Sequence, residues 1–213
     1  GQAVLEDDLA VQERYDQVIA ALQEAVEKKT SVTGYEGARM FATNGELIQA
    51  HGGQITKWGD TYYWYGEDKT DGYQPRGVHL YTSKDLYNWE DQGLVLKTME
   101  DIRQMDTDPY FNQLYGALTE EERQEVFRHI SFHSSVLERP KVLYNEKTQK
   151  YVLWFHADSG DYGKAMAGVA VADKPEWPFQ FLQASRLHSS EAFTGSEKGM
   201  ARDMNVFQDE DGT

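Results

Sequence analysis

Three short segments of this chain carry ionisable residues at corresponding positions of a repeated module. His51 opens the first segment, Glu138 and Arg139 open the second, and Arg202 and Asp203 open the third. Two carboxyl groups and an imidazole in one place could transfer protons, one group donating and another accepting. Hydrolysis of a glycosidic bond uses such a pair of carboxyl groups. Each residue alone is better explained as a surface or capping group, so the prediction depends on their shared place in the repeat.

The elements that must position these residues follow a pattern of strand, polar turn and strand. The first copy covers residues 51–65 and the second covers residues 138–155, whereas the third begins at residue 202 and reaches the end of the sequence. Such a repeat is typical of propellers and related arrays. We therefore expect an all-β propeller in which the first strand of each blade lines a central channel and brings the three segments to one mouth.

Further strands complete each unit. The hairpin turns are predicted at Gly59–Asp60 and Asn145–Gln149, and the third strands at Gly77–Thr82 and Gly168–Ala172. The aromatic pair Trp177 and Phe179 follows the second of these. Each unit then holds about four short strands, which is the content of a propeller blade.

Two segments predict helices. Residues 8–29 carry one apolar stripe at helical spacing, which consists of Val11, Tyr15, Val18, Leu22 and Val26. Residues of about 98–135 separate the two units and read as a helical insertion, with proline in a first turn at Asp108–Pro109 and a capping box at Thr119–Glu122. We expect residues 1–37 to be an N-terminal helical segment or the end of an upstream helical module, and residues 38–213 to be the propeller domain.

Composition limits the classes of function. The formal net charge is -15 and the isoelectric point is about 4.7, which disfavours binding to nucleic acid. The chain has no cysteine and no run of about 18 apolar residues, so it predicts no disulfide and no membrane span. The 209–213 stretch resembles half of a calcium loop but reads better as a hairpin turn. No metal and no cofactor is predicted.

Other polar residues could reach the same mouth. Glu67 and Asp68 follow the second strand of the first unit, and Tyr162 lies in the loop after the corresponding strand of the second unit. His156 is read either as a polar core residue or as part of the site.

The same segments resemble a known family. Residues 50–55 with 62–68, then residues 138–145 and 202–213, are similar to the openings of the first three blades of glycoside hydrolase family 43, nearest to its exo-β-1,3-galactanase-like branch. The resemblance covers roughly residues 40–213. It implies a five-bladed propeller that hydrolyses glycosidic bonds with inversion, here of β-linked galactose in plant-type polysaccharide or glycan chains.

The resemblance also assigns roles to residues. It places Asp203 on the carboxylate that tunes the pKa of the catalytic acid, and Glu138 on a second-blade carboxylate of the active site; these are the two predicted catalytic residues. The predicted substrate-binding residues are His51, Glu67, Tyr162, His156 and Arg202. The usual catalytic base position holds His51 and glycines instead of aspartate, and the galactanase-like branch also lacks that aspartate.

The acid glutamate of the family belongs to a fourth blade, and this chain covers about two and a half blades. We therefore expect the remaining blades to come from the rest of a parent protein or from a second chain, and the isolated chain to be inactive. The alternatives are a carbohydrate-binding propeller without catalysis, a family 43 arabinofuranosidase or xylosidase, and a protein-interaction propeller. A glycan-degrading role predicts a secreted, surface or periplasmic bacterial protein.

Overall fold

The computed structural model describes residues 16–17, 19–20, 23–24, 35–36, 39–187 and 198–209. Residues 16–17, 19–20 and 23–24 fall within the predicted helix over 8–29, and these three pairs are helical. The other residues of that predicted helix lie outside the described part of the chain. None of the described helices is long and apolar enough to cross a membrane.

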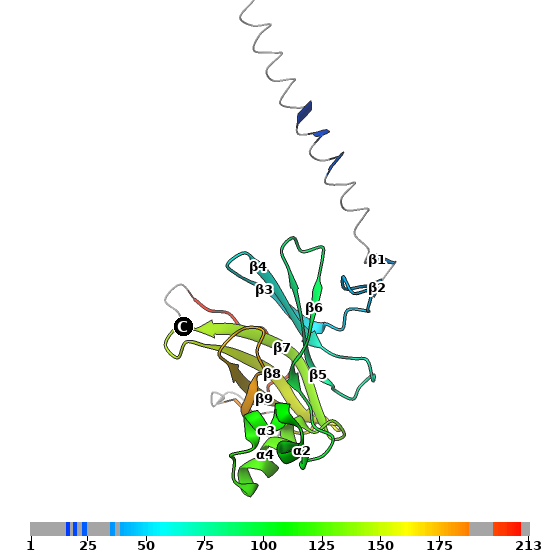
Figure 1. Ribbon diagram of the computed structural model, residues 1–213. Coiled ribbons are helices and arrows are strands. Elements are labelled where there is room, and N and C mark those ends of the chain that lie inside the picture. The colour runs from blue at the N-terminus through cyan, green and yellow to red at the C-terminus, as the bar shows by residue number, and fades with distance from the viewer. Residues whose placement is uncertain are drawn as a thin grey trace, which may run out of the picture.

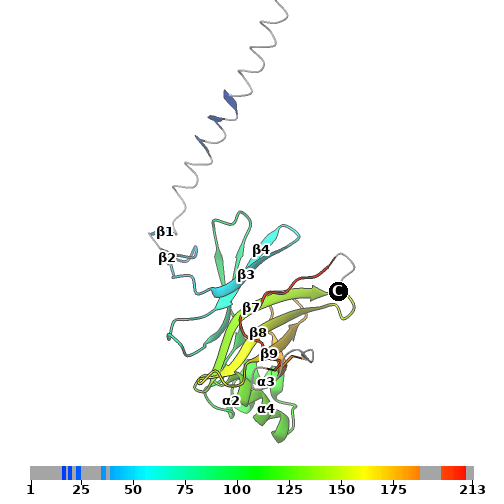
Figure 2. The same cartoon turned by 180° about the vertical axis from the view of Figure 1, so that it is seen from behind.

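Two four-stranded antiparallel sheets dominate the described residues (Figures 1 and 2). The first sheet has the order β3-β4-β5-β6 and the second has the order β7-β8-β9-β10, so each sheet follows the chain without a crossover. The strands of the first are β3 (His51–Trp58), β4 (Thr61–Glu67), β5 (Gly77–Ser83) and β6 (Glu90–Lys97). Those of the second are β7 (Ser135–Asn145), β8 (Lys150–Ser159), β9 (Met166–Ala172) and β10 (Gln180–Ser185). The two predicted blade-like units are thereby confirmed.

A two-stranded ribbon precedes the first sheet. It consists of β1 (Tyr35–Glu36) and β2 (Arg39–Met40), paired antiparallel. The segment that follows covers the outer face of the first sheet, where Ala42 packs with Tyr81 and Trp89. The bend at residues 41–50 then leads directly into β3.

The two sheets pack face to face, and their facing side chains form the core. Alternating residues of β4 and β8 point into it, among them Tyr65 and Phe155, both fully buried. The Tyr65 hydroxyl donates to the Pro175 carbonyl at 2.9 Å, which ties the first sheet to the turn before β10. Gly168 of β9 leaves room for the Phe155 ring, because a Cβ there would overlap it. The packing places β3 beside β7.

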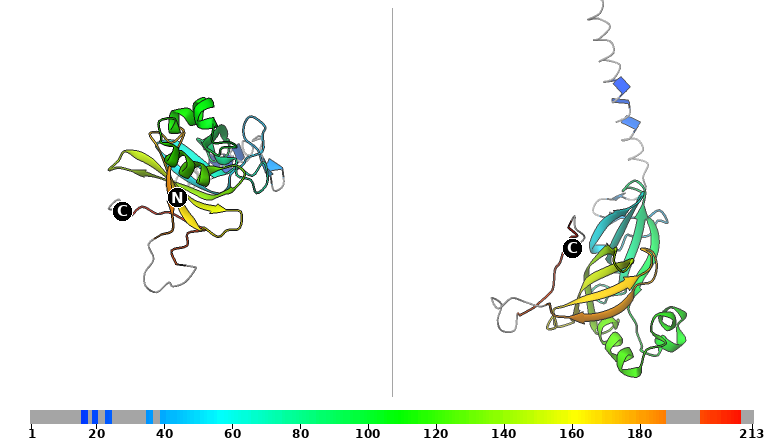
Figure 3. Two further views of the ribbon diagram at one scale, coloured as in Figure 1. Left: turned by 90° about the horizontal axis from the view of Figure 1, so that it is seen from below. Right: turned by 90° about the vertical axis from the view of Figure 1, so that its left-hand side faces the viewer.

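Three helices lie between the two sheets in sequence and cover one end of them (Figures 1 and 3). They are α2 (Gln104–Thr107), α3 (Pro109–Tyr115) and α4 (Glu120–Ile130). The Asp108 side chain caps α3, and Thr119 with Glu122 forms the predicted capping box of α4. The Tyr115 hydroxyl accepts the Phe181 backbone N–H at 2.9 Å and so fastens α3 to β10.

The third copy of the repeat differs from its prediction. Residues 201–209 form no strand, and residues 210–213 of the predicted hairpin lie outside the described residues. A strand needs a neighbour to satisfy its backbone groups, and no described strand pairs with this segment. It is held instead by the Ala201 N–H, which donates to the Ala165 carbonyl at 2.8 Å, and by the side chain of Asp203.

Candidate functional site

Two β-bulges lie side by side at the start of the inner strands. The register of β3 shifts between His51 and Gln54, and that of β7 shifts between Glu138 and Lys141. A bulge re-aims side chains and bends its strand. Arg139 adopts a left-handed backbone with φ of 55°, which a residue with a side chain adopts only when its surroundings fix it. Both strands therefore have irregular backbones at the ionisable residues that the sequence predicts for the site.

The buried side chain of Lys141 joins the two bulges. Its ammonium donates to the Gly52 carbonyl at 2.9 Å and to the Arg139 carbonyl at 3.2 Å. Burial, followed by the neighbouring Arg139 charge, lowers the pKa of Lys141. This lysine connects the first sheet to the second, near a cluster of carboxylates that includes Glu67 and Asp203.

Glu67 lies at the centre of that cluster and is only 2 % exposed. Its Oε1 accepts the Arg139 backbone N–H at 2.9 Å, and its Oε2 lies 3.1 Å from Nδ1 of His51 and 3.0 Å from Nζ of Lys69. A side chain at Gly52 would overlap the Glu67 carboxylate. Gly52, directly after His51, thus leaves space for Glu67.

Glu138 lies on the other side of Lys69. The Lys69 ammonium is 3.4 Å from Oε1 of Glu138, and the Tyr162 hydroxyl donates to the same oxygen at 2.8 Å. Burial, followed by the hydrogen bond to Glu138, raises the pKa of Tyr162 to about 12, so it remains a donor at neutral pH. Two carboxylates from separate sheets therefore share one ammonium group.

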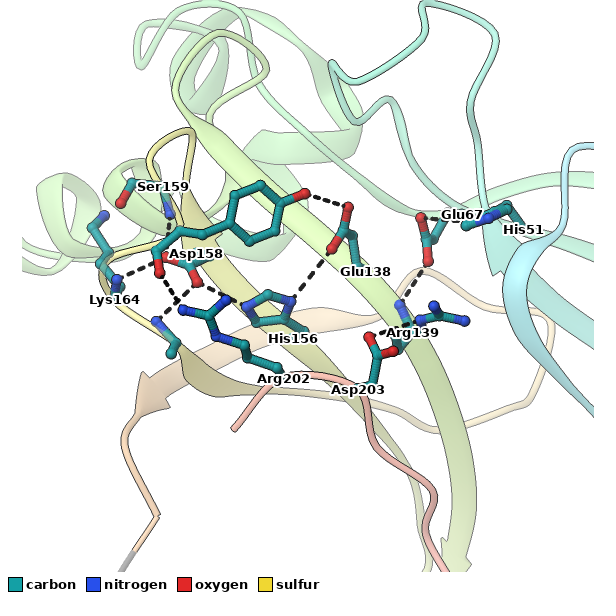
Figure 4. Close-up of polar contacts among 12 residues, drawn as sticks. His51, Glu67, Glu138, Arg139, His156, Asp158, Ser159, Lys164, Arg202 and Asp203 are labelled. Atoms are coloured by element: carbon teal, nitrogen blue, oxygen red, sulfur yellow. Dashed lines mark hydrogen bonds and ion pairs between the residues drawn. The ribbon is translucent and has the colours of Figure 1, made fainter. Parts of the chain in front are cut away.

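The loop that carries Tyr162 is folded around Asp158. The Asp158 carboxylate accepts the backbone N–H groups of Ser159, Lys164 and Ala165. Figure 4 shows these contacts, together with His156 between Asp158 and Glu138. The loop is thereby fixed with its tyrosine pointing to Glu138.

The third segment closes one side of the cluster. Asp203 Oδ1 accepts from Nε of Arg139 at 2.9 Å, and Arg202 donates from Nη2 to the Tyr162 carbonyl at 2.8 Å (Figure 4). The Asp203 side chain is 74 % exposed, so its ion pair is largely in solvent. An open cleft of about 400 Å³ lies here, lined by residues of both bulges and by residues 203–205.

All of the residues predicted for the site therefore meet in one network. His51, Glu67, Glu138, Tyr162, His156, Arg202 and Asp203 are connected through hydrogen bonds and ion pairs. Their individual roles remain predictions. The His156 ring is buried behind Glu138 and is 2 % exposed.

The sequence reading did not assign three residues of the network. Lys69 supplies the ammonium group that Glu67 and Glu138 share. Lys141 links the two bulges, and Asp158 anchors the loop that carries Tyr162. Asp158 could have been found from its place two residues after His156, because alternate residues of a strand share a face. For the two lysines the sequence carries no comparable signal.

Behind the cluster, His79 is held between two carboxylates. Its Nδ1 lies 3.1 Å from Asp68 Oδ2 and its Nε2 lies 2.7 Å from Asp91 Oδ1. Asp68 also accepts the Thr70 backbone N–H at 2.9 Å and so fixes the start of the loop that carries Lys69. The histidine therefore supports the loop on which the shared ammonium group depends.

Raising the pH above neutral is expected to weaken this support. Burial alone would lower the pKa of His79, but hydrogen bonds to Asp68 and Asp91 raise it above its usual value. Such a group stabilises the fold fully below its unfolded pKa of about 6.5, and that contribution is lost as the pH rises through the folded pKa. Urea denaturation from pH 6 to 9 should show the free energy of unfolding of the wild type falling relative to that of His79→Gln. Parallel curves for the two proteins would contradict the assignment.

Comparisons with known proteins are consistent with this geometry. No protein-family model and no curated protein matches the chain. Solved structures do match it. An exo-β-1,3-galactanase from Phanerochaete chrysosporium, solved with galactose, is 35% identical with a TM-score of 0.61, over 82% of this chain and 33% of its own.

Two further structures match to the same degree. An exo-β-1,3-galactanase from Clostridium thermocellum is 36% identical with a TM-score of 0.61, over 83% of this chain and 33% of its own. A β-1,3-galactosidase of glycoside hydrolase family 43 is 37% identical with a TM-score of 0.62, over 83% of this chain and 31% of its own. The chain therefore belongs to glycoside hydrolase family 43, among its exo-β-1,3-galactanase-like members, and spans less than half the length of the solved chains that it matches.

Proposed function

We propose that this chain carries part of the sugar site of an inverting glycoside hydrolase that removes β-linked galactose from polysaccharide or glycan chains. One observation carries the proposal: Glu67 and Glu138, from two different sheets, meet at Lys69 and Tyr162 in a chain similar to galactanases. A galactanase of this group has been solved with galactose and another form of it with β-1,3-galactotriose. Carboxylates, an ammonium group and a tyrosine hydroxyl are the partners that sugar hydroxyls need.

The proposed chemistry assigns a different role to each carboxylate. Glu138 accepts hydrogen bonds from the sugar at the bond to be cleaved and helps to position water. Asp203, exposed at the cleft, tunes the pKa of a catalytic acid that a further blade would supply. In an inverting site the acid and base carboxyls stand about 6.5–9.5 Å apart, which leaves room for that water. A complete five-bladed ring and a secreted or surface location are parts of the same proposal.

Hydrolysis of β-1,3-galactan tests the proposal. The complete protein that contains this chain is expected to release galactose, whereas the 213-residue chain alone is expected to release none. Galactose binding without release by the complete protein would favour a carbohydrate-binding propeller. Release of arabinose or xylose from matched substrates, without release of galactose, would favour the other specificities of the family.

Tyr73→Ala is expected to lower the affinity for β-1,3-galactobiose about fivefold. The Tyr73 side chain is 86% exposed, and its ring centre lies 5.8 Å from the Lys69 ammonium, so it stands at the rim of the cluster. Sugar contact with about 40 Å² of apolar ring is worth about 1 kcal/mol at ~25 cal/mol per Å², or about fivefold. Isothermal titration measures the effect.

Tyr87→Ala is the matched control, since Tyr87 is also exposed but lies in the turn between β5 and β6, at the other end of the first sheet. Its affinity should equal that of the wild type. Equal affinity in Tyr73→Ala as well would show that this ring makes no contact with the sugar.

A further inference from the structure

Two buried ionisable residues behind Glu138 have no part in the proposed sugar contacts. His156 and Asp158 lie two residues apart on β8, and each is 2 % exposed. Figure 4 shows the order of the groups: Asp158, then the His156 ring, then Glu138. A row of carboxylate, imidazole and carboxylate with a buried imidazole requires its protons to be placed consistently, because two acceptors that face each other form no hydrogen bond.

Asp158 is the fixed end of this row. Its Oδ1 accepts the Ser159 N–H at 2.8 Å and the Lys164 N–H at 2.7 Å, and its Oδ2 accepts the Ala165 N–H at 2.9 Å. Burial alone would raise the pKa of Asp158, but these backbone hydrogen bonds and the one from His156 hold it below its usual value. Asp158 is therefore an ionised carboxylate at neutral pH and acts only as an acceptor.

That assignment fixes one nitrogen of His156. Nε2 lies 2.8 Å from Oδ2 of Asp158, so it carries a hydrogen and donates. The other nitrogen, Nδ1, lies 3.4 Å from Oε2 of Glu138 and has no hydrogen-bond partner as oriented. Within this row of Asp158, His156 and Glu138, Nδ1 is the one buried side-chain atom without a hydrogen-bond partner.

The remaining contact admits few arrangements. If His156 is neutral and Glu138 ionised, two lone pairs face each other across 3.4 Å, and the buried Nδ1 is left without a hydrogen bond, which costs its desolvation with nothing in return. One proton between the two atoms removes the conflict. It can reside on Nδ1, which gives an imidazolium between two carboxylates, or on Oε2, which gives a carboxyl group that donates to Nδ1.

We propose that His156 and Glu138 hold one shared proton between Nδ1 and Oε2, with Asp158 as the anchor of the row. His156 is then a positioning residue that sets how many protons Glu138 holds, from its buried position behind that residue. Its role in galactose binding rests on the proposed function, whereas the shared proton does not. This site has no aspartate at the usual base position. With the shared proton, Glu138 could hold or release a proton there.

The groups around this pair come from four segments. Tyr162, from the loop after β8, donates to Oε1 of Glu138, and its ring lies 5.8 Å from that of His156. Lys69 lies against the same Oε1 and also pairs with Glu67 of β4. Arg202 lies 6.0 Å from the Tyr162 ring centre. These positive and donor groups favour a charged Glu138 and hence a proton on the imidazole side.

Nitrogen-15 spectroscopy of the histidine rings of the intact chain tests the proposal. At pH 7 we expect either both His156 nitrogens to be protonated, or Nε2 alone with a protonated Glu138 carboxyl seen by carbon-13. Exposed His133 provides an internal reference for an ordinary ring. A His156 ring with a bare Nδ1 beside an ionised Glu138 would overturn the proposal.

Glu138→Gln gives the matched variant, because the neutral amide can donate its own N–H to Nδ1 and needs no extra proton. We expect this variant to lose one bound proton at pH 7, with Nδ1 unprotonated and the His133 signal unchanged. A His156 ring that still carries a proton on Nδ1 in the variant would overturn the proposal. A failure of galactose to bind would count against the proposed function and would leave the nitrogen result standing.

Discussion

Replacing Glu138 by glutamine is expected to lower kcat for galactose release by the complete protein about 10²- to 10⁴-fold, the usual range for one positioned proton-transfer group. The variant keeps the shape of the side chain and removes its charge. Its Oε1 loses the attraction of Lys69, which lies 3.4 Å away, and its Oε2 can no longer share a proton with His156. Initial rates on β-1,3-galactan measure the effect.

Glu146→Gln is the matched control, since Glu146 is an exposed residue in the turn between β7 and β8. Its kcat should equal that of the wild type. If Glu138→Gln also turns over at the wild-type rate, Glu138 does not belong to the reaction.

Phe155→Ala is expected to lower the free energy of unfolding by about 3–5 kcal/mol, the cost of a large aromatic cavity. The Phe155 ring is fully buried between the sheets and lies 6.1 Å from the ring of Phe181. Gly168 on the neighbouring strand has no side chain that could fill the space. A loss of this size is a large part of the stability of an ordinary domain. Urea denaturation measures it.

The same substitution at an exposed phenylalanine gives the control. Phe207 is 82% exposed, so Phe207→Ala should change the free energy of unfolding by less than about 0.5 kcal/mol. A loss below about 1 kcal/mol in Phe155→Ala would show that the two sheets do not depend on each other for stability.

The hairpins of both sheets were predictable because their signals are local. Gly59, at the predicted turn between β3 and β4, has a positive φ of 58° that suits glycine. The predicted turn at 145–149 separates β7 from β8 in the same way. Turn residues and alternating side chains act within a few positions, so one sequence is enough to read them.

The segment at 202–207 shows where this reading fails. Its sequence has the same alternation as the other two copies, yet it forms no strand in the described residues. Strand formation depends on a neighbouring strand as well as on the alternation of side chains, and this alternation carries no information about whether a neighbouring strand is present.

The candidate site was predictable only in outline. The shared place in the repeat brought His51, Glu138 and Asp203 to one region, as the inner strands of a propeller require. It could not show that Lys69 bridges two carboxylates or that Lys141 joins two bulges. Those contacts arise from side chains that meet across two sheets, and no spacing along the chain encodes them.

A nuclear magnetic resonance titration of this chain with galactose, with glucose as the epimeric control, tests whether this cluster binds galactose. We expect saturable shift changes with galactose at Glu67, Glu138 and Tyr162, and much smaller ones with glucose. No response to galactose at these residues, or an equal response to both sugars, would contradict the assignment of this cluster as a galactose site.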